Sequence, residues 1–278
     1  MKLHMVKKGV FSSILFATLV SSAYAGHAAK MVQPPQAPGS FYVGIFGGGG
    51  SSGKFNVNQY GTAFFTEAEG GPLAVNAFGS TGSQSTWLVG GQVGFKARDI
   101  AIDSEWSLTP AVELETYYFG SQSFSGHLGN DTTRLPEHDF AVTYPMNRSV
   151  YLANAVLNIN NLCYRFHPYV GAGFGGAIVR INGATAAQVA PPEVGINHYN
   201  ANGSDAAPTF AGQVKAGLSY DVNEWISVFA EYRWLYLSTT HFTFGSTVYP
   251  THVPTSSWQV TVGRQEYNMG TAGIRFAL

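Results

Sequence analysis

Apolar and polar side chains alternate with a period of two in segments of about ten residues along this chain. In the segment 108–121, Val112 and Leu114 alternate with Glu113 and Glu115. Carboxylates interleaved with large apolar residues are typical of a strand with one wet face and one lipid face. Eight such segments can be placed: 40–49, 86–97, 108–121, 149–160, 167–181, 209–222, 226–236 and 271–278. The pattern predicts an all-β protein, a transmembrane antiparallel up-and-down β-barrel of eight strands.

Composition supports a surface that faces lipid. Charged residues are 11% of the 278 and aromatic residues 14%, whereas ordinary soluble domains carry about 25% charged residues. A low content of charged residues could also indicate disorder, but disordered chains are poor in aromatic residues, and this chain is rich in them. After residue 20 no run of 18 apolar residues occurs, so a helical membrane protein is excluded. Only a closed barrel then satisfies all backbone groups within lipid.

The first residues predict export. Lys2, Lys7 and Lys8 precede an apolar stretch at 10–20, and a small-x-small cleavage site ends at Ala25. Eleven apolar residues are too few to span a bilayer, which needs about 20, so a signal peptide is favoured over an anchor. The expected location is the cell outer membrane of a Gram-negative bacterium.

The expected organisation is a signal peptide at 1–25, a flexible leader at 26–39 and a barrel domain at 40–278. Cleavage removes three of the 15 basic residues and none of the 16 acidic ones, which leaves 12 minus 16, a formal charge of −4. A chain with this balance has no basic surface for nucleic acid. Cys163 is the only cysteine, so no intrachain disulfide forms.

The connections between the predicted strands alternate in length, as in outer-membrane barrels with short periplasmic turns and long external loops. The long ones are 50–85, 122–148, 182–208 and 245–257. They are rich in Gly, Ser, Asn, Thr and Pro, a composition that needs no packed core. We therefore expect four external loops without a core of their own.

Several charged residues fall on the inward faces of the predicted strands. They are Lys96, Glu113, Glu115, Lys215, Glu231, Arg233 and Arg275. An unpaired charge in a narrow interior costs several kcal/mol, so we expect the acids to pair with the bases in a structural plug. A selectivity ring in a conducting pore is the alternative. The plug is favoured because side chains fill the interior of an eight-stranded barrel.

Aromatic residues near strand ends or on outward faces predict girdles at the membrane interfaces, in preference to a carbohydrate-binding platform. They are Trp87, Tyr118, Tyr220, Trp225, Trp234, Tyr236 and Phe276.

No motif predicts catalysis, a cofactor or a metal. The glycines at 171, 173 and 176 match a dinucleotide fingerprint, but no helix is expected after them, and the motif works only between a strand and a helix. The loop histidines His127, His138, His198 and His252 lack ligand spacing, and scattered loop histidines are usually solvated. We expect no catalytic, cofactor-binding or metal-binding residues, and no enzyme activity.

Three short segments resemble the OmpA-like and opacity-protein-like family of eight-stranded outer-membrane barrels, the surface-antigen type. They are 168–173 (PYVGAG), 217–222 (GLSYDV) and 231–233 (EYR). The end of the chain is also similar to the assembly signal of that family, carried here by Gly273, Phe276 and Leu278. The resemblance implies outer-membrane lipids, lipopolysaccharide and the barrel-assembly machinery as partners.

Two classes of function remain. The first is a structural and surface role, in which long external loops bind a host or cell-surface ligand. The second is passage of small solutes through the barrel, as in a porin or channel. Recognition concentrates in loops on a rigid scaffold, so surface display ranks first. An outer-membrane lipid-modifying hydrolase is a distant third.

Overall fold

The computed structural model describes residues 39–130, 139–161 and 163–278. The predicted signal peptide with its cleavage site after Ala25, and the leader up to residue 38, lie outside the described residues. Within the described ranges, no helix is long and apolar enough to cross a membrane.

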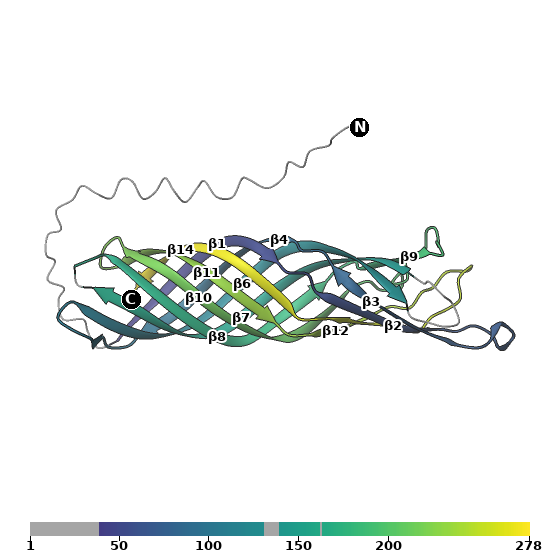
Figure 1. The fold of residues 1–278 in the computed structure, drawn as a ribbon, viewed down its shortest axis with the longest axis horizontal. Helices are drawn as coiled ribbons and strands as arrows, with labels where there is room; N and C mark the ends of the chain where they lie inside the picture. The colour runs from purple at the N-terminus through teal and green to yellow at the C-terminus, as the bar shows by residue number, and fades with distance from the viewer. Residues whose placement is uncertain (1–38, 131–138, 162) are drawn as a thin grey trace, which may run out of the picture. The chain divides into compact units, whose positions relative to one another are not determined.

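Eight antiparallel strands close into a ring, and they are the eight strands predicted from the alternation. They are β1 (Ser40–Ser52), β4 (Ser85–Lys96), β6 (Trp106–Asn130), β7 (Asp139–Asn161), β8 (Phe166–Ile181), β10 (Asp205–Asp221), β11 (Ile226–Leu237) and β14 (Gln265–Ala277). Each pairs with the next along the chain, and β14 pairs with β1 to complete the ring (Figure 1). The predicted up-and-down barrel is confirmed.

Six shorter strands belong to the same sheet. They are β2 (Asn56–Ala63), β3 (Leu73–Thr81), β5 (Ile100–Ala101), β9 (Thr185–Ala190), β12 (Thr240–Phe244) and β13 (Trp258–Val262), and a single 3-10 turn, η1 (Glu67–Glu69), links β2 to β3. Apart from β5, they extend the tube at the end far from the C-terminus (Figure 1).

The expectation that these long connections are loops without a core of their own was therefore wrong. The strands β2 and β3 lie within 50–85, β9 lies within 182–208, and β6 and β7 continue through much of 122–148. Polar, glycine-rich composition marked these segments as loops, but their backbone groups pair from strand to strand in the order β6-β3-β2-β13-β12. Paired backbone leaves few groups to be satisfied by water.

The extension continues the barrel strands after a short break in four of them. The breaks fall at 53–55, 82–84, 238–239 and 263–264, between β1 and β2, β3 and β4, β11 and β12, and β13 and β14. Neighbouring breaks lie beside one another: the Gly53 N–H donates to the Glu266 carbonyl at 2.8 Å, and the Ser52 N–H donates to the Gln84 carbonyl at 2.9 Å. Four strand paths thus cross the same level of the wall, each with a short joint that is not part of a strand.

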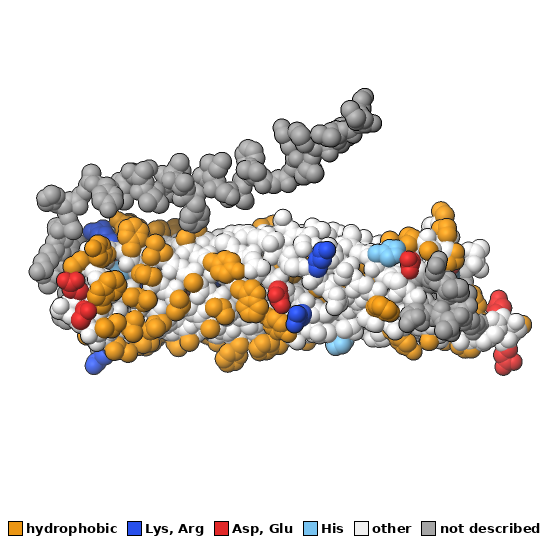
Figure 2. Space-filling view, in the orientation of Figure 1, with side chains coloured by type: hydrophobic (Ala, Val, Ile, Leu, Met, Phe, Trp, Pro, Cys, Tyr) orange, Lys and Arg blue, Asp and Glu red, His pale blue; other side chains and the backbone are white. Residues whose placement is uncertain are grey.

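The outer wall changes character at these breaks. Toward the C-terminal end the outward side chains are apolar, with Ile45, Leu114 and Phe174 exposed by 64%, 65% and 68%. Figure 2 shows hydrophobic side chains gathered over that half of the tube. Such a continuous apolar surface needs lipid around it. We call this part of the wall, from the breaks to the C-terminal end, the membrane segment, and the remainder the external segment.

The height of the membrane segment fits a bilayer. The strand β11 takes ten steps from Ile226 to Tyr236; at about 3.3 Å per residue and a tilt of about 40°, these rise about 25 Å, the height of the apolar band of an outer-membrane barrel. In contrast β7 has 23 residues, twice what a tilted strand of about ten residues needs to cross. The surplus forms the external segment.

Aromatic side chains lie near both edges of the membrane segment. Trp87 and Tyr118 are exposed near one edge, with ring centroids 6.2 Å apart. Trp225 and Phe276 are exposed near the other edge, at 60% and 41%. The other three predicted girdle residues, Tyr220, Trp234 and Tyr236, are half-buried. This arrangement matches the aromatic girdles of outer-membrane barrels.

The external segment has a hydrophobic core. Its inward side chains are fully buried, including Phe140, Trp258, Val260 and Val262. The Phe140 and Trp258 ring centroids are 6.3 Å apart. In the external segment these apolar side chains point inward, whereas Ile45, Leu114 and Phe174 of the membrane segment point outward. The difference arises because water and not lipid surrounds the external wall.

Candidate functional site: a charged barrel interior and a folded external tip

The interior of the membrane segment contains a balanced cluster of three acids and three bases. They are Glu113 and Glu115 on β6, Lys215 on β10, Glu231 and Arg233 on β11, and Arg275 on β14. All six were predicted to face inward, and the structure brings them together. Their formal charges cancel, so the cluster can be buried without a net charge.

Lys215 lies at the centre of the cluster. Its Nζ contacts a Glu113 carboxylate oxygen and lies 3.5 Å from Glu115 Oε2. The side chains of all three residues have no exposed surface. Gln213, two residues earlier on β10, donates from Nε2 to Glu115 Oε2 at 2.7 Å. A buried charge that meets both charged and neutral polar partners is far less costly than an isolated one.

Arg233 bridges two of the acids and stacks on a ring. It contacts Glu115, and its Nε donates to Glu231 Oε1 at 2.5 Å. Its guanidinium carbon lies 4.1 Å from the centroid of the Phe46 ring. Arg275 is held in a similar way, 3.5 Å from a Glu113 oxygen and 4.2 Å from the centroid of the Phe229 ring. A planar guanidinium suits both contacts at once.

Glycines make room for tyrosines that reach the buried acids. Tyr169 on β8, Gly217 on β10 and Glu231 on β11 form one row across three strands. The Tyr169 hydroxyl passes over Gly217 and donates to Glu231 Oε2 at 2.8 Å. The same arrangement occurs in the row Tyr42, Gly94 and Glu113. A ring that covers a glycine on the neighbouring strand is a known stabilising device in sheets.

We expect Gly217→Val to destabilise the barrel by about 1–3 kcal/mol, the usual cost of overpacking an interior. A Cβ at Gly217 would lie 2.6 Å from the Tyr169 ring and 2.7 Å from the Glu231 Cβ, so the tyrosine would lose its hydrogen bond. Urea unfolding of the protein in phospholipid vesicles measures the loss. The control is Gly270→Ala, because a Cβ at Gly270 meets nothing within 4 Å. Equal stability of the two variants would contradict the packing argument.

The remaining predicted residues lie apart from the cluster. Lys96 forms no ion pair within the described residues, and its Nζ lies 5.7 Å from the centroid of the Tyr42 ring. Of the assembly-signal residues, Gly273 lies in β14 under the Phe229 ring, and Phe276 faces outward from the same strand. The Leu278 N–H donates to the Phe41 carbonyl at 2.9 Å, so the end of the chain is tied to β1. Recognition of these residues by an assembly factor stays a prediction.

The interior leaves no water-sized space beside five of the six charged side chains of the cluster. The side chains of Glu113, Glu115, Lys215, Glu231 and Arg233 are each 0% exposed. A continuous aqueous path past them would give some of these atoms an accessible surface. A filled interior is what an eight-stranded barrel is expected to have.

The exposed end of the external segment carries apolar side chains that no lipid covers. We call its three turns, 64–72, 191–204 and 245–257, the tip. Phe64, Val194 and Val248 lie there, exposed by 50%, 95% and 63%, and Figure 2 shows hydrophobic side chains at this end of the tube. Exposed hydrophobic groups on a water-facing surface can serve as contacts for another surface.

The tip is rigidly joined across its turns. The Phe64 N–H donates to the Pro254 carbonyl at 2.9 Å. The Asn200 side chain exchanges two hydrogen bonds with the Val248 backbone, at 2.7 and 2.8 Å. None of the tip's three turns contains Lys or Arg, while 64–72 contains Glu67 and Glu69. The tip is therefore an ordered surface of apolar and acidic character.

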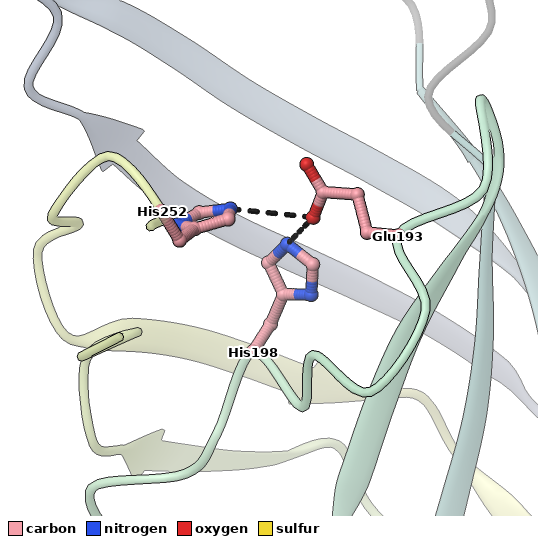
Figure 3. Close-up of side chains that lie close together, drawn as sticks. All are labelled: Glu193, His198 and His252. Atoms are coloured by element: carbon pink, nitrogen blue, oxygen red, sulfur yellow. Dashed lines mark ion pairs between the residues drawn. The ribbon is translucent and has the colours of Figure 1, made fainter. Parts of the chain in front are cut away.

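Two of the four loop histidines meet in the tip. His198 Nε2 lies 3.4 Å and His252 Nε2 3.3 Å from the same Glu193 oxygen (Figure 3). His198 is buried at 3% exposure, so its predicted solvated position was wrong. The hydrogen bond with Glu193 raises the pKa of His252 above its ordinary value.

The sequence offered no spacing signal for this group, because it is assembled from two turns more than 50 residues apart. The other two histidines lie elsewhere. His127 is exposed and pairs with Asp139 at 2.9 Å, and His138 lies outside the described residues.

Comparison with known proteins gives one family and several similar folds. The model of a family described as "Surface antigen" matches residues 83–278. No curated protein sequence matches the chain. Similar solved structures include neisserial surface protein A, with 15% identity, TM-score 0.34 and coverage of 86% of this chain and 99% of that one. Another is the outer membrane protease OmpT of Escherichia coli, with 9% identity, TM-score 0.43 and coverage of 86% and 97%. Ail of Yersinia pestis, solved with the heparin analogue sucrose octasulfate, has 10% identity, TM-score 0.26 and coverage of 82% and 99%.

Proposed function

Because this chain belongs to the surface-antigen family, we propose that it is an outer-membrane surface protein whose tip binds a protein on another surface. The family match fits an eight-stranded outer-membrane barrel. The apolar outer wall fits a location in the outer membrane. The observation that carries the binding role is the exposed apolar side chains of the tip, Phe64, Val194 and Val248.

The chemistry of the tip favours a protein partner with apolar and basic groups. A surface without Lys or Arg in its three turns repels polyanions such as sulfated polysaccharides and attracts basic patches. Hydrogen bonds across the turns keep the surface ordered before binding, which lowers the entropy cost of association. We propose a binding role and not a catalytic one, because the tip offers contact area.

The test compares attachment of Gram-negative cells that display the protein to host-cell monolayers. We expect the triple variant Phe64→Ser, Val194→Ser and Val248→Ser to lose attachment at least about tenfold, because anchor residues each supply about 1–2 kcal/mol. Phe78→Ser is the matched control: Phe78 is 52% exposed but lies on β3, away from the tip. Unchanged attachment of the triple variant at equal surface amounts would contradict the proposal.

We also expect no steady conductance from the purified protein in planar bilayers, because charged side chains without accessible surface fill the interior. Large stable current steps would favour solute passage instead. We further propose that lipid and lipopolysaccharide contact the apolar wall, and that the barrel-assembly machinery recognises β14.

A further inference from the structure

We propose that Glu193, His198 and His252 bind a divalent transition-metal ion, with zinc as the reference ion, which links two turns of the tip. We call these three residues the tip cluster. Glu193 and His198 lie in the turn between β9 and β10, and His252 lies in the turn between β12 and β13. Figure 3 shows both imidazole rings directed at one carboxylate oxygen. The ligand atoms of the three residues all lie within 4.8 Å of one another.

The hydrogen bonds of both rings orient the Nε2 atoms toward the Glu193 carboxylate. His198 Nδ1 lies 3.1 Å from the Ala186 carbonyl oxygen, and His252 Nδ1 lies 2.6 Å from the Val253 carbonyl oxygen. A carbonyl oxygen only accepts, so each Nδ1 carries the proton and donates it. In the neutral form each Nε2 then has a lone pair. Metal-binding histidines are oriented in this way, by a donated hydrogen bond from the other ring nitrogen.

This tautomer assignment leaves two lone pairs and a negative oxygen facing one another. Such an arrangement is repulsive unless positive charge lies between them, as a proton on each ring or as one cation among all three. Imidazole and carboxylate ligands together suit zinc, copper, nickel and cobalt, while calcium and magnesium prefer sites made of oxygen alone. The composition of the tip cluster therefore points to the transition metals.

Two of the three separations between the ligand atoms fit a small tetrahedral ion. Ligands about 2.1 Å from a tetrahedral zinc lie about 3.4 Å from one another. The two Glu193 distances, 3.4 Å to His198 Nε2 and 3.3 Å to His252 Nε2, agree with that edge. Two histidines and one carboxylate leave a fourth position for water. The exposed fractions, 3%, 14% and 31% for His198, His252 and Glu193, show that solvent reaches the cluster from the Glu193 side.

The surroundings hold the two turns in place. Thr247 Oγ1 donates to the His198 carbonyl at 3.0 Å, and the Asn197 N–H donates to the Tyr249 hydroxyl at 3.1 Å. The His198 ring packs edge-on against Phe140 and Trp258, with centroids 5.1 and 5.8 Å away. A site whose ligands are positioned by packing and backbone hydrogen bonds needs little rearrangement to bind its ion.

The test is calorimetric titration of the tag-free, chelator-washed protein in detergent micelles with zinc chloride alone. We expect one zinc per chain. His252→Ala should weaken binding by more than about 100-fold, since even an outer-shell partner contributes 10–100-fold. His252 is partly exposed, so this variant should keep its fold, which far-ultraviolet circular dichroism checks. The matched control His241→Ala removes an exposed histidine of β12 that bonds Thr261 and should bind zinc as the wild type does.

Cobalt provides a second readout that does not depend on affinity. The wild type with one equivalent of Co²⁺ should show the visible absorption bands of a four- or five-coordinate ion, and Glu193→Gln should change them. Zinc should also slow proteolysis within 245–257 several-fold in the wild type and not in His252→Ala. Absence of stoichiometric zinc binding by the wild type, or equal binding by the His252→Ala and His241→Ala variants, would overturn the proposal. Neither outcome bears on cell attachment, so the two proposals are judged separately.

Discussion

Arg233→Met should destabilise the folded barrel by about 3–5 kcal/mol, the cost of removing one partner from a buried ion pair. The substitution leaves Glu115 and Glu231 without their shared cation in a site of 0% exposure, and it removes the contact with the Phe46 ring. Urea unfolding in phospholipid vesicles, followed by tryptophan fluorescence, measures the change in the free energy of unfolding.

The matched control is Arg264→Met, at an arginine whose side chain is 75% exposed. A surface substitution of this kind changes stability by no more than about 0.5 kcal/mol. Adding Glu115→Gln to Arg233→Met should recover part of the loss, because the uncompensated carboxylate is then gone. If Arg233→Met and Arg264→Met unfold at the same urea concentration, the charged cluster does not stabilise the folded barrel.

Trp258→Ala should destabilise the external segment by about 3–5 kcal/mol while the membrane segment stays folded. Trp258 is 1% exposed and packs against Phe140 and His198, and its indole N–H donates to Thr247 Oγ1 at 3.2 Å. Hydrogen exchange measured by mass spectrometry should become faster in β12, β13 and β2 but not in residues 211–221 of β10, which pair with β11 in the membrane segment.

Tyr60→Ala is the control for this second substitution. Tyr60 also lies in the external segment and is aromatic, but its side chain is 48% exposed, so its removal leaves no cavity. Faster exchange throughout the barrel in Trp258→Ala would show that the two segments unfold together. Unchanged exchange in β12 and β13 would show that the external core contributes little.

The membrane segment was predictable because lipid and a narrow interior impose opposite demands on alternate residues. Val112 and Leu114 had to face outward once Glu113 and Glu115 required an interior, and the structure places all four so. The charged cluster could be foreseen as a set but not as pairs. Which acid meets which base depends on strand stagger, and Lys215 reaches Glu113 across strands that are not neighbours.

The external segment was missed although a local signal was present. In 258–262, Trp258, Val260 and Val262 alternate with Gln259 and Thr261, an ordinary strand pattern. The glycine-rich and polar composition of the neighbouring residues outweighed it.

The tip cluster had no such local signal. Its residues come together because hydrogen bonds join the turn 191–204 to the turn 245–257, about 50 residues further along the chain. Long-range pairing of this kind cannot be read from one sequence.

The side-by-side breaks at 53–55 and 82–84, and at 238–239 and 263–264, bear on how such a protein can diversify. Each pair of breaks flanks one hairpin, β2–β3 or β12–β13, whose two strands pair with each other in the external segment. The ring strands keep their own registers with one another on the membrane side of the breaks, so sequence changes confined to either hairpin leave the pairing of the lipid-facing ring in place.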